Sequence, residues 1–357
     1  TLNPANEKVY EFVEALVAEA KAIFPFEYLH IGGDEVEPEH WNNNADIQAF
    51  MRANKIKDSE ALQAHFNQRL QKILHKYQRK MIGWDEIQHP QLPKDIVIQS
   101  WRGQDGVQQA VAAGFQAILS TGFYLDQPQS AAYHYRNDPI PPVFDQDKLT
   151  GLIGNKNADE KVSSWSFELP RKRGSPVTGS FTLVNLGENN YRGVVDFKGK
   201  SRRPVIIHQA NKSQAVFSLD TWMGPVEFRV AFTNDKVQGR AIVGNAPYVL
   251  SGKKIAPQLT NPELSMPPLS AQTKQLIVGG EAALWTEIVN EQSIDLRLWP
   301  RAFVVAERLW SAQRLQDENA MYLRKKTIAD WSEKSLGLLH RAQTESALET
   351  LFGERHL

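Results

Sequence analysis

The sequence predicts an α/β protein in which short parallel strands alternate with helices, and an inserted all-β domain interrupts the series. Short apolar segments with little alternation end in glycine or polar residues, which is typical of parallel strands covered on both faces. Segments with helical spacing of apolar residues lie between them. From about Glu160 to Leu250 the pattern changes to alternating strands. A βα run of this kind suits a (β/α)8 TIM barrel or a doubly wound sheet.

The first segments predict a helix, a strand and a second helix. Apolar residues recur with helical spacing from Asn6 to about Ile23, and Pro25 ends this helix. Residues 27–33 are expected to form a short buried strand that two glycines terminate. Residues 59–79 again carry apolar side chains on one face, so they predict an amphipathic helix.

The same alternation continues along the chain and resumes after the insert. Further buried strands are predicted at residues 80–84, 95–101, 115–120 and 275–285. A short helix at 105–114 separates two of them, and a helix at 299–311 and a helical tail follow the last.

The all-β insert is assigned to residues 137–274, between a first barrel part at 1–136 and a last part at 275–357. Proline-rich linkers at 137–145 and 256–270 bound it. Its strands are predicted at residues 163–169, 179–186, 191–199, 204–209, 214–220, 226–233 and 241–250. Short alternating strands of this kind fit a small sandwich or barrel.

Composition limits the class of protein. Of the 357 residues, 41% are hydrophobic and 23% charged, as expected of a globular protein with a substantial core. The formal net charge is zero, so we expect no nucleic-acid partner. No apolar run approaches the roughly 18 residues that span a bilayer. The absence of Cys excludes disulfides and thiolate metal sites. Because the chain begins with Thr1 and residues 1–12 do not resemble a signal peptide, we expect a processed chain or part of a longer one.

Polar and aromatic residues follow every predicted parallel strand. They are Asp34 and Glu35, then Trp84, Asp85 and Glu86, then Trp101 and Arg102, then Tyr124 and Asp126, and finally Trp285 and Glu287. Catalytic groups of a TIM barrel lie at the carboxyl ends of its strands, whereas a doubly wound sheet concentrates them at one switch point. This distribution favours the barrel.

The adjacent acids Asp34 and Glu35 need an explanation, because neighbouring carboxylates repel and raise each other's pKa when both are partly desolvated. A solvated acidic turn tolerates such a pair because water screens the repulsion. Alternatively, the pair serves a site that needs one charged acid and a neighbour able to hold a proton.

The segments "HIGGDE", "GWDE", "QSWRG", "STGFYLDQ" and "GGEAALWTE", in this order, resemble the family 20 glycoside hydrolases, which are β-N-acetylhexosaminidases and chitobiases. The resemblance covers about residues 1–136 and 275–315 and leaves out the insert. It implies a TIM barrel of which this chain holds strands 4 to 8. An upstream segment with strands 1 to 3 is therefore an expected partner. The implied substrate is an N-acetylhexosaminide carbohydrate, with no cofactor and no metal.

The resemblance also implies a role for each site residue. Glu35 is the expected general acid and base, Asp34 holds the acetamido N–H, and Tyr124 donates to the acetamido oxygen, which acts as the nucleophile. The expected substrate-binding residues are His30, Trp84, Trp101, Asp126, Trp285 and Glu287. The three tryptophans are expected to wall the pocket, the two acids to accept hydrogen bonds from sugar hydroxyls, and the histidine to act as an orienter. Glu86 and Arg102 are expected to support these substrate-binding residues without contacting the sugar themselves.

Several alternatives stay open from the sequence. One is a non-catalytic carbohydrate-binding protein that keeps the sugar pocket. Another is a (β/α)8 hydrolase with two distant carboxylates, which would not need the 2-acetamido group. His30, Asp34, Glu35 and His40 could be drawn as a metal cluster, but their spacing matches no zinc motif.

Two further expectations concern the insert and the surroundings of the protein. Trp165, Tyr191 and Trp222 of the insert could be sugar platforms, but we favour core positions. The substrate class suits an extracytoplasmic location, whether periplasmic, outer-membrane-associated or secreted, and a dimer is possible.

Overall fold

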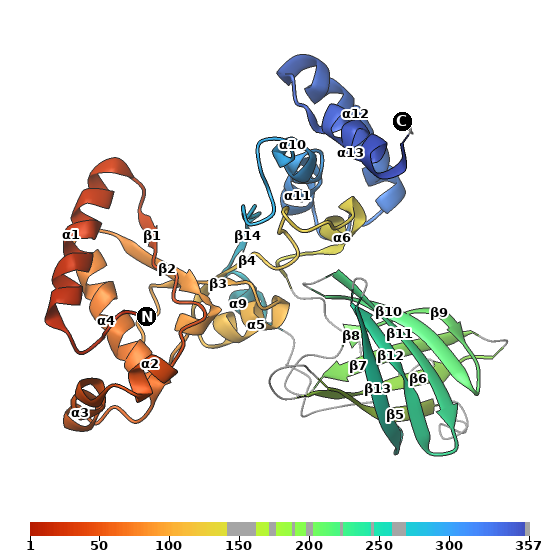
Figure 1. Cartoon of the computed structure of the whole chain (residues 1–357), viewed down its shortest axis with the longest axis horizontal. Coiled ribbons are helices and arrows are strands. Elements are labelled where there is room, and N and C mark those ends of the chain that lie inside the picture. Colours follow the sequence, from red (N-terminus) through yellow and green to blue (C-terminus); the bar gives the residue numbers. More distant parts are fainter. Residues whose placement is uncertain are drawn as a thin grey trace.

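A computed structural model of the chain contains two sheets of different kinds (Figure 1). It describes residues 1–140, 162–170, 176–187, 190–197, 203–221, 224–243, 246–258 and 269–353. The first sheet has five strands in the order β1-β2-β3-β4-β14, and the second has nine in the order β8-β7-β6-β5-β13-β12-β11-β10-β9. The chain therefore combines an α/β part with a large antiparallel sheet.

All neighbouring strands of the first sheet are parallel. The strands are β1 (Tyr28–His30), β2 (Lys80–Trp84), β3 (Val97–Ser100), β4 (Gln116–Leu119) and β14 (Ile277–Gly280). Each lies within a segment predicted as a strand. Because β14 pairs with β4, the antiparallel sheet is inserted between two strands that are neighbours in space.

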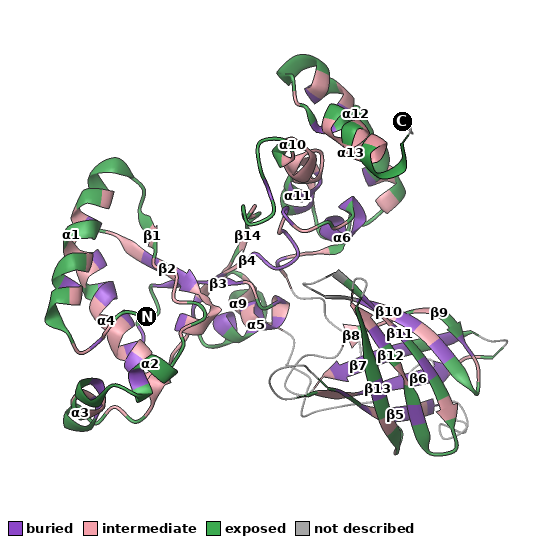
Figure 2. Cartoon of the chain, in the orientation of Figure 1, coloured by how far each residue is buried: buried purple, intermediate pink, exposed green. Residues whose placement is uncertain are grey.

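The prediction that every parallel strand is buried is wrong for the two outer ones. β3 is buried throughout, whereas β1 and β14 are partly or largely exposed (Figure 2). The reason is topological, since β1 pairs only with β2 and β14 only with β4. Both strands are therefore open edges of the sheet.

The connection from β2 to β3 contains only a short 3₁₀ helix, Asp85–Ile87. α-Helices precede β1 and connect β1 to β2 and β3 to β4. They are α1 (Glu7–Ile23), α2 (Glu39–Asn42), α3 (Ala45–Ala53), α4 (Ser59–Lys76) and α5 (Gln104–Ala112). The side chain of Asn6 caps α1 by accepting from the backbone N–H of Lys8. Only part of the predicted apolar stripe of α1 is buried, because Val17 packs into the main core while Phe12 is 62% exposed. The sequence analysis did not predict α2 and α3.

A second group of helices lies beyond β4 and β14 (Figure 1). They are α6 (Ala131–Arg136), α10 (Ile294–Leu298), α11 (Arg301–Trp310), α12 (Glu318–Leu336) and α13 (His340–Phe352), whereas α9 (Ala271–Lys274) lies beside α5. Tyr135, Val304 and Met321 form a small core between α6, α11 and α12. Among the described residues, no helix is both long and apolar enough to cross a membrane.

The nine-stranded sheet is antiparallel and curls around one core. Its strands are β5 (Val162–Leu169), β6 (Val177–Asn185), β7 (Tyr191–Phe197), β8 (Arg203–Pro204), β9 (Ile206–Ala210), β10 (Gln214–Thr221), β11 (Gly224–Thr233), β12 (Lys236–Val243) and β13 (Ala246–Ile255). Phe181 of β6 and Phe217 of β10 belong to the same cluster although their strands are far apart in the sheet. β7 and β9 also contact each other, so the sheet bends back on itself. The described strands thus form one continuous, strongly curved antiparallel sheet.

Trp165 and Tyr191 are buried in this core, and Trp165 stacks on Phe232 with ring centroids 4.6 Å apart. The preference for core positions is confirmed for these two, and Trp222 lies outside the described residues. The prediction of one strand at 241–250 is wrong, because it spans the end of β12 and the start of β13. A Gly-Asn pair between two alternating segments is a hairpin signal, and the sequence has one at 244–245. Much of both predicted linkers also lies outside the described residues.

Candidate active site

A loop of unusual backbone conformation carries Asp34 and Glu35 directly after β1. Gly32, Gly33 and Glu35 have φ values of 70°, 91° and 47°, which fall in the left-handed region that favours glycine. A Cβ on Gly33 would lie 2.3 Å from Cγ2 of Ile87, so this position has no room for a side chain. Both acidic side chains are exposed. The loop therefore turns sharply and presents the two carboxylates to solvent.

His30 lies at the end of β1 and contacts this loop. Its Nδ1 accepts a 3.0 Å hydrogen bond from the backbone N–H of Gly32, so the neutral ring carries its proton on Nε2. Its ring packs edge-on against Trp84 with centroids 4.9 Å apart. Desolvation lowers the pKa of His30, against the opposing charges of Glu281 and Asp34. More than a third of the residue is nevertheless exposed, because β1 is an edge strand.

The structure brings together four predicted site residues that lie on or just after four different strands: His30, Trp84, Tyr124 and Trp285. The rings of Trp84 and Trp285 lie 6.2 Å apart, and Tyr124 meets Trp285 edge-on at 6.1 Å. Tyr124 is placed by a parallel bridge to Ala283, which extends the pairing of β4 with β14. Trp285 is 42% exposed, so this aromatic cluster forms an accessible surface.

The hydroxyl of Tyr124 is held in its protonated form. Burial raises its pKa to about 12, a hydrogen bond with Trp285 opposes this, and the charges of Asp126, Asp85 and Asp34 add to the rise. A neutral phenol is a hydrogen-bond donor over the whole physiological range. Tyr124 can therefore donate a hydrogen bond to an acceptor oxygen of a bound ligand.

The loop after Tyr124 is held from behind by α11. Arg301 donates hydrogen bonds to the carbonyl oxygens of Leu125 and Gln127. Asp126 lies in this loop and is 3% exposed, and its carboxylate accepts a 3.4 Å hydrogen bond from the backbone N–H of Trp285. Glu287, the other acid predicted to accept from sugar hydroxyls, is exposed. The two acids are thus in different environments.

Trp101 and Arg102 follow β3 and contact the acids that follow β2. The backbone N–H groups of both donate to Asp85, at 2.8 and 3.1 Å. The indole N–H of Trp101 lies 3.1 Å from Oε2 of Glu86, and the guanidinium of Arg102 forms an ion pair of 2.7 Å with the same carboxylate. Trp101 is therefore fixed through its backbone and its side chain.

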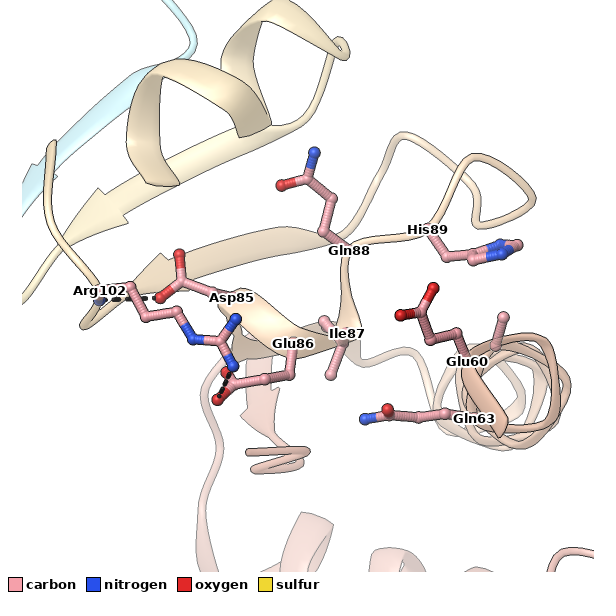
Figure 3. Close-up of a pocket in the computed structure, with 9 residues that line it drawn as sticks. Glu60, Gln63, Asp85, Glu86, Ile87, Gln88, His89 and Arg102 are labelled. Carbon is pink, nitrogen blue, oxygen red and sulfur yellow. Dashed lines mark hydrogen bonds and ion pairs between the residues drawn. The ribbon is translucent and has the colours of Figure 1, made fainter. Parts of the chain in front are cut away.

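A cavity of about 330 Å³ lies beside these acids, between α4 and the loops after β2 and β3 (Figure 3). Its lining residues are Glu60, Gln63, Ala64, Asp85, Glu86, Ile87, Gln88, His89 and Arg102. None of the nine site residues predicted from the sequence lines it. The cavity nevertheless borders the loop of Asp34 and Glu35, because Gln63 donates a 2.8 Å hydrogen bond to the carbonyl of Gly33.

A polar network across the sheet was not predicted; it joins the buried residues Gln99 and Ser120 to the exposed Glu281. Gln99 of β3 is 2% exposed and donates to Oγ of Ser120 at 2.6 Å and to Oε1 of Glu281 at 2.7 Å. The charge of Glu281 also acts on His30. Two signals were available: Gln99 is polar within an apolar strand, and Glu281 directly follows a glycine pair, as Asp34 does. Within the described part of the chain, no three His, Asp or Glu residues are grouped to hold a metal.

A parallel sheet with helical crossovers, whose strand ends carry acids and aromatic rings, defines a catalytic domain of the barrel type. The chain belongs to glycosyl hydrolase family 20, because the model of that family's catalytic domain matches residues 1–165 and 241–313. The structure of a Flavobacterium johnsoniae chitobiase matches with a TM-score of 0.60 and 25% identity, covering 98% of this chain and 35% of that one. A Vibrio harveyi exo-β-N-acetylglucosaminidase has the same fold, with a TM-score of 0.54 and 20% identity over 95% of this chain and 36% of that one.

Curated relatives match over a shorter part of the chain. A β-hexosaminidase of Porphyromonas gingivalis is 36% identical over 142 residues, which are 39% of this chain and 17% of the relative. A β-hexosaminidase of Vibrio furnissii is 36% identical over 170 residues, which are 43% of this chain and 28% of the relative. The chain thus spans well under half the length of these relatives.

Proposed function

We propose that this chain is a catalytic part of a retaining exo-β-N-acetylhexosaminidase. It would remove terminal β-linked GlcNAc or GalNAc from chitin oligosaccharides or glycans. The observation that carries the proposal is that Asp34 and Glu35 are exposed in the loop after β1, and that the charge of Asp34 acts on both Tyr124 and His30 of the aromatic cluster. Family membership and the names of the relatives support it.

The proposed reaction uses the substrate's own acetamido group as the nucleophile. Its carbonyl oxygen forms a bond to the anomeric carbon while the glycosidic C–O bond breaks and Glu35 protonates the departing oxygen, which leaves an oxazolinium ion. Water then attacks the anomeric carbon and Glu35 takes a proton from it. The bond between the anomeric carbon and the acetamido oxygen breaks, which restores the acetamido group. This route needs only one acid–base carboxylate, so two adjacent acids can have different tasks.

Asp34 and Tyr124 serve the acetamido group in this proposal. Asp34 accepts from the amide N–H and stabilises the positive charge that develops on the intermediate, while Tyr124 donates to the acetamido oxygen. The raised pKa of Tyr124 supports a donor role, because the phenol keeps its proton. Trp84, Trp101 and Trp285 would wall the pocket against the methyl group and the apolar sugar face.

The other polar residues orient the sugar in this proposal. Glu287 is exposed, so its carboxylate can accept a hydrogen bond directly from the 4- or 6-hydroxyl of the sugar. Asp126 would share that task through Oδ2, which here accepts from the side-chain amide of Gln127, while Oδ1 accepts from the backbone N–H of Trp285.

The five parallel strands are proposed to be strands 4 to 8 of a (β/α)8 barrel. β1 and β14 are the two open edges of the sheet, and parallel strands are normally buried on both faces. An upstream segment that supplies strands 1 to 3 would pair with these edges and close the barrel. The nine-stranded sheet would then be an insert between the last two strands. An extracytoplasmic location also remains a proposal, from the substrate class.

The test compares release of an aryl leaving group from a β-N-acetylglucosaminide and from the matching β-glucoside. We expect turnover of the acetamido substrate alone and its loss in Glu35→Gln. Glu37→Gln is the matched control, because this exposed carboxylate lies on the same loop. Equal turnover of both sugars would contradict substrate assistance. If the chain is inactive, restoring upstream residues should produce the same selectivity, and inactivity of that longer protein would contradict the proposal.

A further inference from the structure

We propose that Asp85 and Glu86, the second Asp–Glu pair of the sequence, are positioning residues that fix Trp101 and Arg102 and do not touch the substrate. The inference rests on the proposed function in one respect, since Trp101 is proposed there as a wall of the sugar pocket. The structural part of the inference, that the pair fixes Trp101, can be tested separately from activity.

Register explains why this pair reaches Trp101. β2 and β3 are parallel, with Trp84 opposite Gln99. The residues that follow these strands therefore run side by side, so Asp85 and Glu86 lie next to Ser100 and Trp101. Asp34 and Glu35 follow β1 instead and project from a glycine turn into solvent. The same two residue types thus occupy different environments at neighbouring strand ends.

Asp85 binds the backbone of the loop after β3. Its Oδ2 accepts from the N–H groups of Trp101 and Arg102, at 2.8 and 3.1 Å. The space around it is closed, because a Cβ on Gly106 of α5 would lie 2.4 Å from Oδ1 of Asp85 and 2.3 Å from Oγ of Ser100. A carboxylate suits this position, since it accepts from several donors at once. Its hydrogen bonds determine where the backbone of Trp101 lies.

Glu86 binds the side chains of the same loop. Its two oxygens lie 3.2 and 3.1 Å from Nε1 of Trp101, and Oε1 is also 2.7 Å from Nη2 of Arg102. The side chain of Glu86 is only 11% exposed. Figure 3 shows Glu86 and Arg102 pointing toward each other, with Glu60 and Gln63 on α4 across the cavity. The indole is therefore held at its ring nitrogen as well as through its backbone.

Both acids act on the proposed reaction only through Trp101. Small displacements of a group that orients a substrate reduce the rate without removing any reacting group. Loss of Glu86 should therefore raise KM more than it lowers kcat for the acetamido substrate. The pH dependence of kcat should keep its shape, because Glu86 exchanges no proton with the substrate. Loss of Glu35 should instead remove the limb of the pH profile that reports the general acid.

The experiment is a double-mutant cycle between Glu86→Ala and Trp101→Phe. The phenylalanine keeps an aromatic ring but lacks the indole N–H that donates a hydrogen bond to Glu86. We expect Glu86→Ala to lower kcat/KM by about tenfold in the unsubstituted protein, as loss of a charged hydrogen bond does, and by less than about twofold in the Trp101→Phe protein. Glu60→Ala, which removes a carboxylate from the opposite wall of the same cavity, is the control and should have little effect. Equal losses in both backgrounds would overturn the inference.

Near-ultraviolet circular dichroism tests the structural part without any substrate. Glu86→Ala should change the tryptophan signal when Trp101 is present and leave it unchanged in the Trp101→Phe background. An unchanged signal in both backgrounds would also overturn the inference, even if the chain is inactive. Asp85→Ala removes the oxygen that accepts from both backbone N–H groups, and a change in signal larger than that of Glu86→Ala is expected. Because the Asp85 variant can unfold, the double-mutant cycle between Glu86→Ala and Trp101→Phe decides whether the pair fixes Trp101.

Discussion

The side-chain amide of Gln63, on α4, donates a 2.8 Å hydrogen bond to the backbone carbonyl of Gly33, one residue before Asp34. A helix on the outer side of the sheet thus fixes the loop that carries the proposed catalytic acids. Gln63 is half-buried and also lines the cavity beside Glu86. The position of the acids therefore depends on α4 as well as on β1.

Replacing Gln63 tests this dependence. Gln63→Leu keeps the size of the side chain but removes the hydrogen bond, so we expect kcat/KM to fall by about three- to tenfold, as loss of about 1 kcal/mol implies. Gln68→Leu is the matched control, because Gln68 lies on the same helix and bonds the carbonyl of Gln91, away from the loop. Steady-state kinetics with an aryl β-N-acetylglucosaminide compare the two. Equal decreases of kcat/KM in both variants would show that replacing a glutamine disturbs α4 as a whole and does not act through the loop of Gly33.

Gly33 should tolerate no side chain. Gly33→Ala combines a left-handed backbone with a Cβ 2.3 Å from Ile87, so it should destabilise the protein by about 3 kcal/mol. Gly114 has a similar φ of 87° but no atom within 4 Å of a built Cβ, so Gly114→Ala should cost only about 1 kcal/mol. Denaturant unfolding measures both. In an Ile87→Ala background the cost of Gly33→Ala should approach that of Gly114→Ala, and an unchanged cost would contradict the steric explanation.

His134 should make stability fall in mild acid. It is completely buried on α6, its Nδ1 lies 2.7 Å from the carbonyl oxygen of Gly122, and burial lowers its pKa to about 4. The unfolded chain, with an ordinary pKa near 6.5, binds this proton more readily than the folded one. Stability should therefore decrease as pH falls from about 6.5 to about 4, by about 3 kcal/mol in full.

The measurement is the free energy of unfolding against pH for the protein and for His134→Asn. Asparagine can keep a hydrogen bond to Gly122 but does not titrate, so the decrease in that pH window should become smaller in the variant. The same pH dependence in both proteins would exclude His134 as its source.

Tyr124→Phe should lower kcat about 100-fold, because the acetamido oxygen loses the hydrogen bond that orients it for attack on the anomeric carbon. Because the pKa of Tyr124 is about 12, its hydroxyl does not ionise in the working range, and the substitution should leave the shape of the pH profile unchanged. The pH dependence of kcat for both proteins checks this. Loss of a limb below pH 10 in the variant would instead assign Tyr124 a proton-transfer role.

Much of the local structure could be predicted because it follows from short-range patterns. The period of apolar residues located α1 and α4 within a few residues, since one face of each helix had to be apolar. Glycine pairs and polar residues marked where the parallel strands end, and this gave the candidate site residues. The short helices α2 and α3 were not predicted. α2 is a single turn without a periodic signal, whereas α3 has the Asn44 cap and the buried pair Ile47 and Met51 at i and i+4, which are signals of a helix.

The sequence by itself determined which residues follow each strand, and so which acids and rings are candidates for the site. Only the tertiary structure decided their environments. Asp34 and Asp85 each precede a glutamate after a strand, yet one is exposed and the other binds two backbone N–H groups. That difference depends on which strand lies alongside and in which register, because β3 runs beside β2 and brings Trp101 to Asp85. Strand order and register join residues distant along the chain, so no local pattern in the sequence specifies them.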